Sequence, residues 1–133
     1  MSQCRRQIAE RYDEAFADLP VELPTVPAGV ETAWHLYVLR VNAGIEGERD
    51  RVISSLSGLG IATSVHFIPL HLHSYYRETY GYAPEDFPVA TLQFERSLSL
   101  PIYSAMATAD VDRVIEGVRM TFTDVASTSG GGR

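Results

Sequence analysis

Three of the chain's four histidines lie close together in the segment GIATSVHFIPLHLHSYY, which spans residues 60–76. His66, His71 and His73 form an H-x4-H-x-H pattern, and three imidazoles are a ligand set that zinc accepts. This spacing matches no strong zinc motif, however, and no cysteine or carboxylate follows before Glu78. We therefore predict no metal site and interpret these histidines as structural or ligand-binding residues.

The sequence contains no recognisable nucleophilic triad. Ser64 lies two residues before His66, but no G-x-S-x-G elbow surrounds it. Cys4, the single cysteine, lies far from every histidine in the sequence, and the glycines form no phosphate-binding motif. His35 falls in a predicted strand, where a histidine is typically a hydrogen-bonded core residue. We therefore predict neither catalytic nor cofactor-binding residues in this chain.

The charged side chains exclude several classes of function. All eleven cationic residues are arginines, so chemistry that needs a side-chain amine, such as Schiff-base formation, is excluded for this chain alone. The net charge of −6 disfavours nucleic acid, whose binding depends on a basic surface. No apolar run approaches the ~20 residues of a membrane helix, so we expect no membrane partner. A single cysteine and the absence of a secretory signal predict a cytoplasmic protein.

The first half of the chain alternates helical and extended patterns. Apolar periodicity predicts an amphipathic helix over residues 4–19, followed by a proline-rich connector over 20–32. AWHLYVLRV, residues 33–41, is rich in β-branched and aromatic residues and predicts a central strand that is apolar on both faces. A second helix is predicted by the apolar stripe at Val52, Ile53, Leu56 and Leu59, with glycine as its C-terminal stop.

The second half begins with a predicted strand over residues 61–68 and an aperiodic segment over 70–86. Long irregular loops of this kind are often functional. A short helix over 87–96, a strand over 97–103 and a final helix with Thr108 as its N-cap complete the order. Three strands and four helices favour an α/β fold of the α+β two-layer type, in which helices cover a small three-stranded sheet.

Resemblance to a known family extends this interpretation. The pattern GIxTxxHFxPLH at residues 60–71, followed by Tyr75 and Tyr76, resembles the signature of the C-terminal domain of the DegT/DnrJ/EryC1/StrS aminotransferases. RRQIAERYDEAF resembles the helix that leads out of the family's large domain, WHLYVLRV its first small-domain strand, and TADVDRVIEGVR its final helix. The resemblance extends from Arg5 to Met120 and implies a pyridoxal-phosphate (PLP) enzyme that aminates nucleotide-linked keto-sugars.

The resemblance also implies how the chain is organised. Residues 1–19 would continue a helix from a large domain, 20–32 would connect, 33–122 would form a small domain like that of fold-type I PLP-dependent transferases, and 123–133 a disordered tail. In this family the cofactor lysine, its partner aspartate and the phosphate-binding residues lie in the large domain. We therefore expect no cofactor and no activity in this chain alone, and PLP in the full-length enzyme.

Three residues are carried over from the signature as candidate substrate-binding residues: His66, Phe67 and His71. An imidazole there would hydrogen-bond a sugar hydroxyl or a phosphate oxygen, and an aromatic ring would cover the sugar's apolar face. Phe67 stands where the family usually has tyrosine, so a polar contact through that hydroxyl is not carried over. Core packing of Phe67, and a bracing hydrogen bond from His71 to backbone, remain open as structural alternatives.

The family's homodimers imply an apolar surface that faces the large domain or a second subunit, with Phe16, Tyr75 and Tyr76 as candidate members. Two other functions stay open at this point. Some relatives use the same fold for sugar dehydration, and the residue that distinguishes them lies outside this chain. A free-standing module for ligand binding or oligomerisation is the third possibility.

Overall fold

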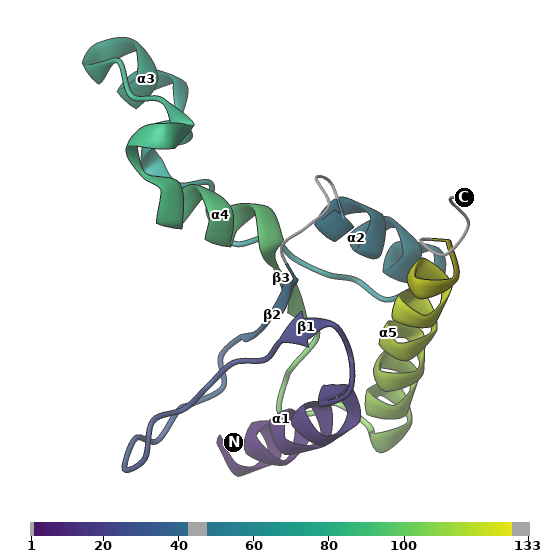
Figure 1. Cartoon of the computed structure of the whole chain (residues 1–133). Coiled ribbons are helices and arrows are strands. Elements are labelled where there is room, and N and C mark those ends of the chain that lie inside the picture. Colours follow the sequence, from purple (N-terminus) through teal and green to yellow (C-terminus); the bar gives the residue numbers. More distant parts are fainter. Residues whose placement is uncertain (1, 43–47, 129–133) are drawn as a thin grey trace.

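A small antiparallel sheet organises the chain in the computed structural model, which describes residues 2–42 and 48–128 (Figure 1). Within these residues, β2 (Tyr37–Val41) lies in the centre, β1 (Val21–Glu22) pairs with one edge and β3 (Ser97–Leu100) with the other. Helices cover this sheet, which confirms the predicted fold class.

The described helices divide into two groups. The bounds are α1 (Ser2–Phe16), α2 (Glu48–Gly58), α3 (Ser74–Tyr80), α4 (Pro88–Arg96) and α5 (Thr108–Thr128), with two short 3₁₀-helices, η1 (Leu70–Leu72) and η2 (Pro84–Asp86). Figure 1 shows α1, α2 and α5 around the sheet, whereas α3 and α4 extend away from it. We call residues 70–96 the arm and the remaining elements the body. None of the described helices is long and apolar enough to cross a membrane.

One hydrophobic core joins the sheet to the helices of the body. The register of β2 with β3 puts Tyr37 and Leu39 on the same face as the two leucines of β3, and all four are buried. Helix α1 adds Tyr12 and Phe16, whose rings stack at 5.5 Å, and Tyr12 meets Tyr37 edge-on at 5.0 Å. Helices α2 and α5 close the core with Val52, Leu56, Val111, Val114, Val118 and Phe122.

Two hydroxyl groups fix α1 against the sheet. Tyr12 donates a hydrogen bond to the carbonyl oxygen of Pro101 (2.8 Å), and Tyr37 donates one to Asp13 Oδ1 (2.7 Å). Burial raises the pKa of both tyrosines, so both hydroxyls keep the proton that they donate. Burial also raises the pKa of the Asp13 carboxyl, although the hydrogen bond from Tyr37 opposes that shift. The first helix is therefore part of the body and shares its core.

Element boundaries in the first half differ from the predictions. Helix α1 ends at Phe16, before the predicted end at residue 19, and the predicted connector contains β1. The predicted strand over 33–41 is confirmed as central but begins only at Tyr37, because Trp34 has a φ of +47°, a left-handed conformation that interrupts an extended strand. Only one of its faces is fully buried, because the helices pack on one side of the sheet.

The strand predicted over residues 61–68 is wrong. This segment forms only an isolated bridge between Ser64 and Ser99. Positive φ angles at Gly60 (+74°) and Phe67 (+47°) turn the chain at both ends, so the extended part is too short to continue the pairing. The third strand of the sheet is instead β1, which pairs with β2 at the opposite edge of the sheet.

The irregular loop predicted over residues 70–86 is also wrong, because η1, α3 and η2 form there. These helices span only three to seven residues, which is too few to show a period in the sequence. Gly81 ends α3 in a left-handed conformation (φ +68°), with its N–H donating to the Arg77 carbonyl.

The last elements follow the predictions closely. Helix α4 begins with Pro88 in its first turn, and β3 follows it directly. Helix α5 begins at Thr108, but the Ala107 carbonyl accepts its first hydrogen bond, so the cap lies one residue earlier than predicted. Helix α5 also continues to Thr128, into the tail expected to be disordered, and residues 129–133 lie outside the described part.

Candidate functional site

The signature histidines lie in three different environments. His66 is half-buried on the body, His71 is buried in the arm, and the exposed His73 has its Nε2 3.1 Å from the Ile68 carbonyl oxygen. In the part of the chain that the structure describes, no three His, Cys, Asp or Glu residues are grouped to hold a metal ion. The H-x4-H-x-H pattern therefore does not correspond to one site.

His71 connects two parts of the arm. Its side chain is only 5% exposed, and its Nε2 lies 2.9 Å from Thr91 Oγ1. The Thr91 hydroxyl donates its single proton to the Pro84 carbonyl (2.9 Å), so the Nε2–H of His71 is the donor to Thr91. The His71 ring also packs against Phe87 at 4.8 Å. His71 thus braces η1 against α4. The partner of its ring is the Thr91 side chain and not the backbone group predicted from the sequence. The contact of His71 with substrate stays a prediction.

Phe67 is presented to solvent at the junction of body and arm. Its side chain is 88% exposed, so the core-packing alternative is wrong. Its φ of +47° is unfavourable for a bulky residue, and such strain concentrates at functional positions. The Phe67 ring lies 6.0 Å from that of His66, so two of the three signature candidates are neighbours.

A hollow of about 290 Å³ lies on the body next to His66. His35, Ser64 and Ser99 also line it. The prediction of His35 as a core histidine is wrong: the turn at Trp34 places His35 before β2 begins, and its side chain is exposed. Sequence reasoning missed Ser99, although the alternation SLSL in β3 is the signal that separates its serines from the buried leucines.

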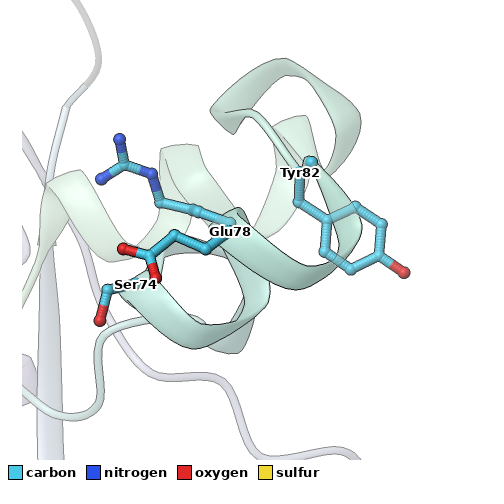
Figure 2. A pocket seen from close by; sticks show the side chains of 5 residues that line it. Ser74, Glu78 and Tyr82 are labelled. Carbon is cyan, nitrogen blue, oxygen red and sulfur yellow. The ribbon is translucent and has the colours of Figure 1, made fainter.

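A second hollow, of about 320 Å³, lies at the far end of the arm. Figure 2 shows Ser74 and Glu78 on the same side of α3, as their four-residue spacing requires, while the ring of Tyr82 points outward. Arg77 and Gly81 also line this hollow, and its five described lining residues are all exposed. This surface brings together no nucleophile and base, so we assign it no chemistry.

The arm carries a continuous series of aromatic rings. Tyr75, Tyr76, Tyr80 and Tyr82 contact one another in sequence order at centroid distances of 5.2, 6.1 and 5.6 Å, and Tyr82 meets Phe87 at 5.1 Å. Tyr75 is 63% exposed, and neither α3 nor α4 contains a buried residue. The prediction that Phe16 forms an apolar surface together with Tyr75 and Tyr76 is wrong for Phe16, which lies fully buried in the core of the body.

The comparison with protein families decides which family this fold and signature belong to. A model described as the DegT/DnrJ/EryC1/StrS aminotransferase family matches residues 1–119. The chain belongs to the DegT/DnrJ/EryC1/StrS aminotransferase family. It is 46% identical over 122 residues to the spore coat polysaccharide biosynthesis protein SpsC of Bacillus subtilis, and the match covers 90% of this chain and 31% of SpsC.

Solved structures of family members have the same fold. A putative sugar aminotransferase from Streptococcus pneumoniae matches with a TM-score of 0.88 at 31% identity, over 98% of this chain and 33% of that protein. A DegT/DnrJ/EryC1/StrS aminotransferase from Brucella abortus matches with a TM-score of 0.76 at 34% identity, over 91% of this chain and 31% of its own. The chain therefore spans about a third of the length of its relatives.

The backbone strain at Phe67 generates a prediction about stability. Phe67→Gly should raise the free energy of unfolding by up to about 1 kcal/mol, because glycine tolerates the left-handed conformation and the exposed ring loses little packing. Phe67→Ala, which removes the ring and keeps the strain, should change the free energy of unfolding by less than about 0.5 kcal/mol. Urea denaturation measures both variants. Marked destabilisation by Phe67→Ala would show that the ring packs against the protein in solution.

Proposed function

We propose that this chain is the small C-terminal domain of a cytoplasmic PLP-dependent enzyme that aminates nucleotide-linked keto-sugars, and that it is inactive alone. The observation that carries the proposal is a difference in length. The family model matches nearly the whole of this chain, residues 1–119, but the chain corresponds to only about a third of the length of its relatives. The sugar substrate is supported by the sugar aminotransferase from S. pneumoniae and by the role of SpsC in polysaccharide biosynthesis.

The residues of this chain do not fit PLP on their own. A transaminase of this kind attaches the cofactor through a lysine amine, and the chain contains none. Among the residues that the structure describes, no aspartate lines either hollow to pair with the pyridinium nitrogen. The S. pneumoniae aminotransferase has been solved in a PLP-form, which supports PLP in the full-length protein. We therefore propose that residues outside this chain hold the cofactor.

The contribution of this chain is then one wall of the substrate site. His66 and Phe67 lie side by side where the arm leaves the body, and Phe67 projects into solvent. An exposed aromatic ring held in a fixed backbone conformation is suited to cover the apolar face of a sugar, and the imidazole beside it exchanges hydrogen bonds with hydroxyl groups. His71 contributes as a positioning residue, because its bond to Thr91 holds the arm at this junction.

The arm is our candidate for the surface that contacts the rest of the enzyme. It presents Leu70, Tyr75 and Val89 to solvent, with 66%, 63% and 72% of their surface exposed. A monomeric protein rarely keeps so much apolar surface uncovered. We propose that in the full-length homodimer this surface packs against the large domain or the second subunit, and that nucleic acid and membranes are not partners.

The absence of an amine generates a prediction about cofactor retention. This chain, incubated with PLP and passed through gel filtration, should carry no PLP absorbance. The full-length protein should retain the absorbance band and transfer an amino group from a donor to a nucleotide-linked keto-sugar. A stoichiometric band on this chain alone would overturn the proposal. Retention of PLP by the full-length protein with loss of water from the sugar would favour the dehydratase alternative.

The exposed arm generates a prediction about self-association. The sedimentation coefficient of this chain should increase with concentration, because the uncovered apolar surfaces associate. Tyr75→Ser combined with Val89→Ser should reduce this concentration dependence and leave the circular dichroism spectrum unchanged. Thr79→Ser, at an exposed polar position of α3, is the matched control and should behave like the parent chain. A parent chain that sediments as a monomer at every concentration would contradict the assignment of the arm.

A further inference from the structure

We propose that the hollow beside His66 binds a single uncharged, hydroxylated ring, such as the pyranose of a hexose. The hollow lies on the body, next to the junction with the arm. Of its described lining residues, Leu100 belongs to the buried hydrophobic core. The identity of the ring as a sugar rests on the proposed function. The binding itself is inferred from the side chains that line the hollow.

Strand register places the polar groups of the hollow on the face of the sheet opposite the core. Val38 pairs with Ser99 across β2 and β3, so these two side chains project from the same face, away from Tyr37 and Leu39. Ser64 exchanges both backbone hydrogen bonds with Ser99, at 3.2 and 2.8 Å. This bridge holds the segment that carries Ser64 and His66 against the edge of β3.

Two buried polar atoms without partners belong to residues that line this hollow. Ser99 is only 5% exposed, and its Oγ has no hydrogen-bond partner among the residues that the structure describes. The Nε2 of His66 is likewise buried and unpartnered. A buried polar atom without a partner is unfavourable, and most buried polar atoms in native proteins are hydrogen-bonded to protein groups or to ordered water. Two of them at one hollow point to a ligand that supplies hydrogen bonds.

The lining residues define the chemistry of that ligand. Hydroxyls and neutral imidazoles both donate and accept hydrogen bonds, as the hydroxyl groups of a sugar do. The described residues that line the hollow include no arginine, aspartate or glutamate, so neither a phosphate nor a cation meets a charge of opposite sign among them. The apolar lining includes Leu36, Pro101 and Ile102, which suit the C–H face of a ring.

The size of the hollow limits the ligand to one ring. Its volume of about 290 Å³ lies just below the range of roughly 300–1,000 Å³ for small-molecule sites. A whole nucleotide-linked sugar, with its base, ribose and phosphates, needs more space and several charged partners. In the full-length enzyme the hollow would therefore receive the sugar and not the nucleotide.

The test is a nuclear magnetic resonance titration of the isotope-labelled chain. Methyl glucopyranoside and uridine diphosphate glucose should produce saturable shifts of the amide signals of Ser64, His66 and Ser99. Uridine diphosphate and inorganic phosphate should produce none. Equal shifts with phosphate would identify an anion site and overturn the proposal, and so would the absence of saturable shifts with both glucosides.

Two serines of β3 provide a matched pair of variants. Ser99→Ala removes a hydroxyl that has no partner in the described part of the chain, so it should keep or raise the thermal midpoint and weaken binding about tenfold, the loss expected for one hydrogen bond. Ser97→Ala removes the bond that Ser97 Oγ donates to the Gln93 carbonyl (2.6 Å), so it should lower the thermal midpoint and keep the binding. Unchanged glucoside affinity in Ser99→Ala would contradict the proposal.

These results are independent of the test of the proposed function. Lack of glucoside binding would leave the retention of PLP by the full-length protein unaffected. Conversely, a full-length protein that does not transfer amino groups would leave the shifts at Ser99 and His66 as evidence for a ring-binding site.

Discussion

The contact between α1 and the sheet is the constraint on which the rest of the body depends. Its strands span two, five and four residues, which is too little sheet to be stable without a helix packed on it. Tyr12 and Tyr37 provide that packing, with rings 5.0 Å apart. The Tyr12 hydroxyl donates to the carbonyl of Pro101, directly after β3, and the Tyr37 hydroxyl donates to Asp13 on α1. Because the leucines of β3 face this core, the serines of β3 project from the opposite face of the sheet.

One-sided packing also explains where the candidate site lies. The junction residues His66 and Phe67 and the hollow beside Ser99 are outside the core, so their side chains are available for binding. The outer part of the arm is held by the aromatic series and by the hydrogen bonds from His71 through Thr91 to Pro84. The base of the arm is bonded to the body, because Arg96 donates to the Val41 carbonyl and Arg49 donates to the Phe94 carbonyl. Helix α3 contains no buried residue, which supports the proposal that another surface covers the outer part of the arm.

The sequence patterns predicted α4, α5 and β2 correctly, because the formation of these elements depends on residues close together in the sequence. Pro88 and the stripe of α5 located those helices, and the β-branched and aromatic run located β2. The positive φ angles at Trp34 and Phe67 were not predictable, because both residue types normally avoid that conformation. Those two angles account for the late start of β2, the exposure of His35 and the failure of the strand over 61–68.

The candidate site was predictable only in part, for the same reason. The family signature located the consecutive residues His66 and Phe67, whose rings lie 6.0 Å apart, and His71, whose ring turns into the arm. The alternation SLSL indicated that Ser99 lies on the face opposite the leucines, but not that it would line a hollow, because this depends on the bridge to Ser64 and on which face of β3 the core occupies.

The central claim is that this chain supplies contacts to the substrate and none to the cofactor. The most direct measurement is steady-state kinetics of the full-length protein carrying Phe67→Ala, together with its cofactor absorbance. The account predicts a rise of about tenfold in KM for the nucleotide-linked keto-sugar, the loss expected for one aromatic contact, with the absorbance unchanged. Loss of the cofactor band with an unchanged KM would contradict it.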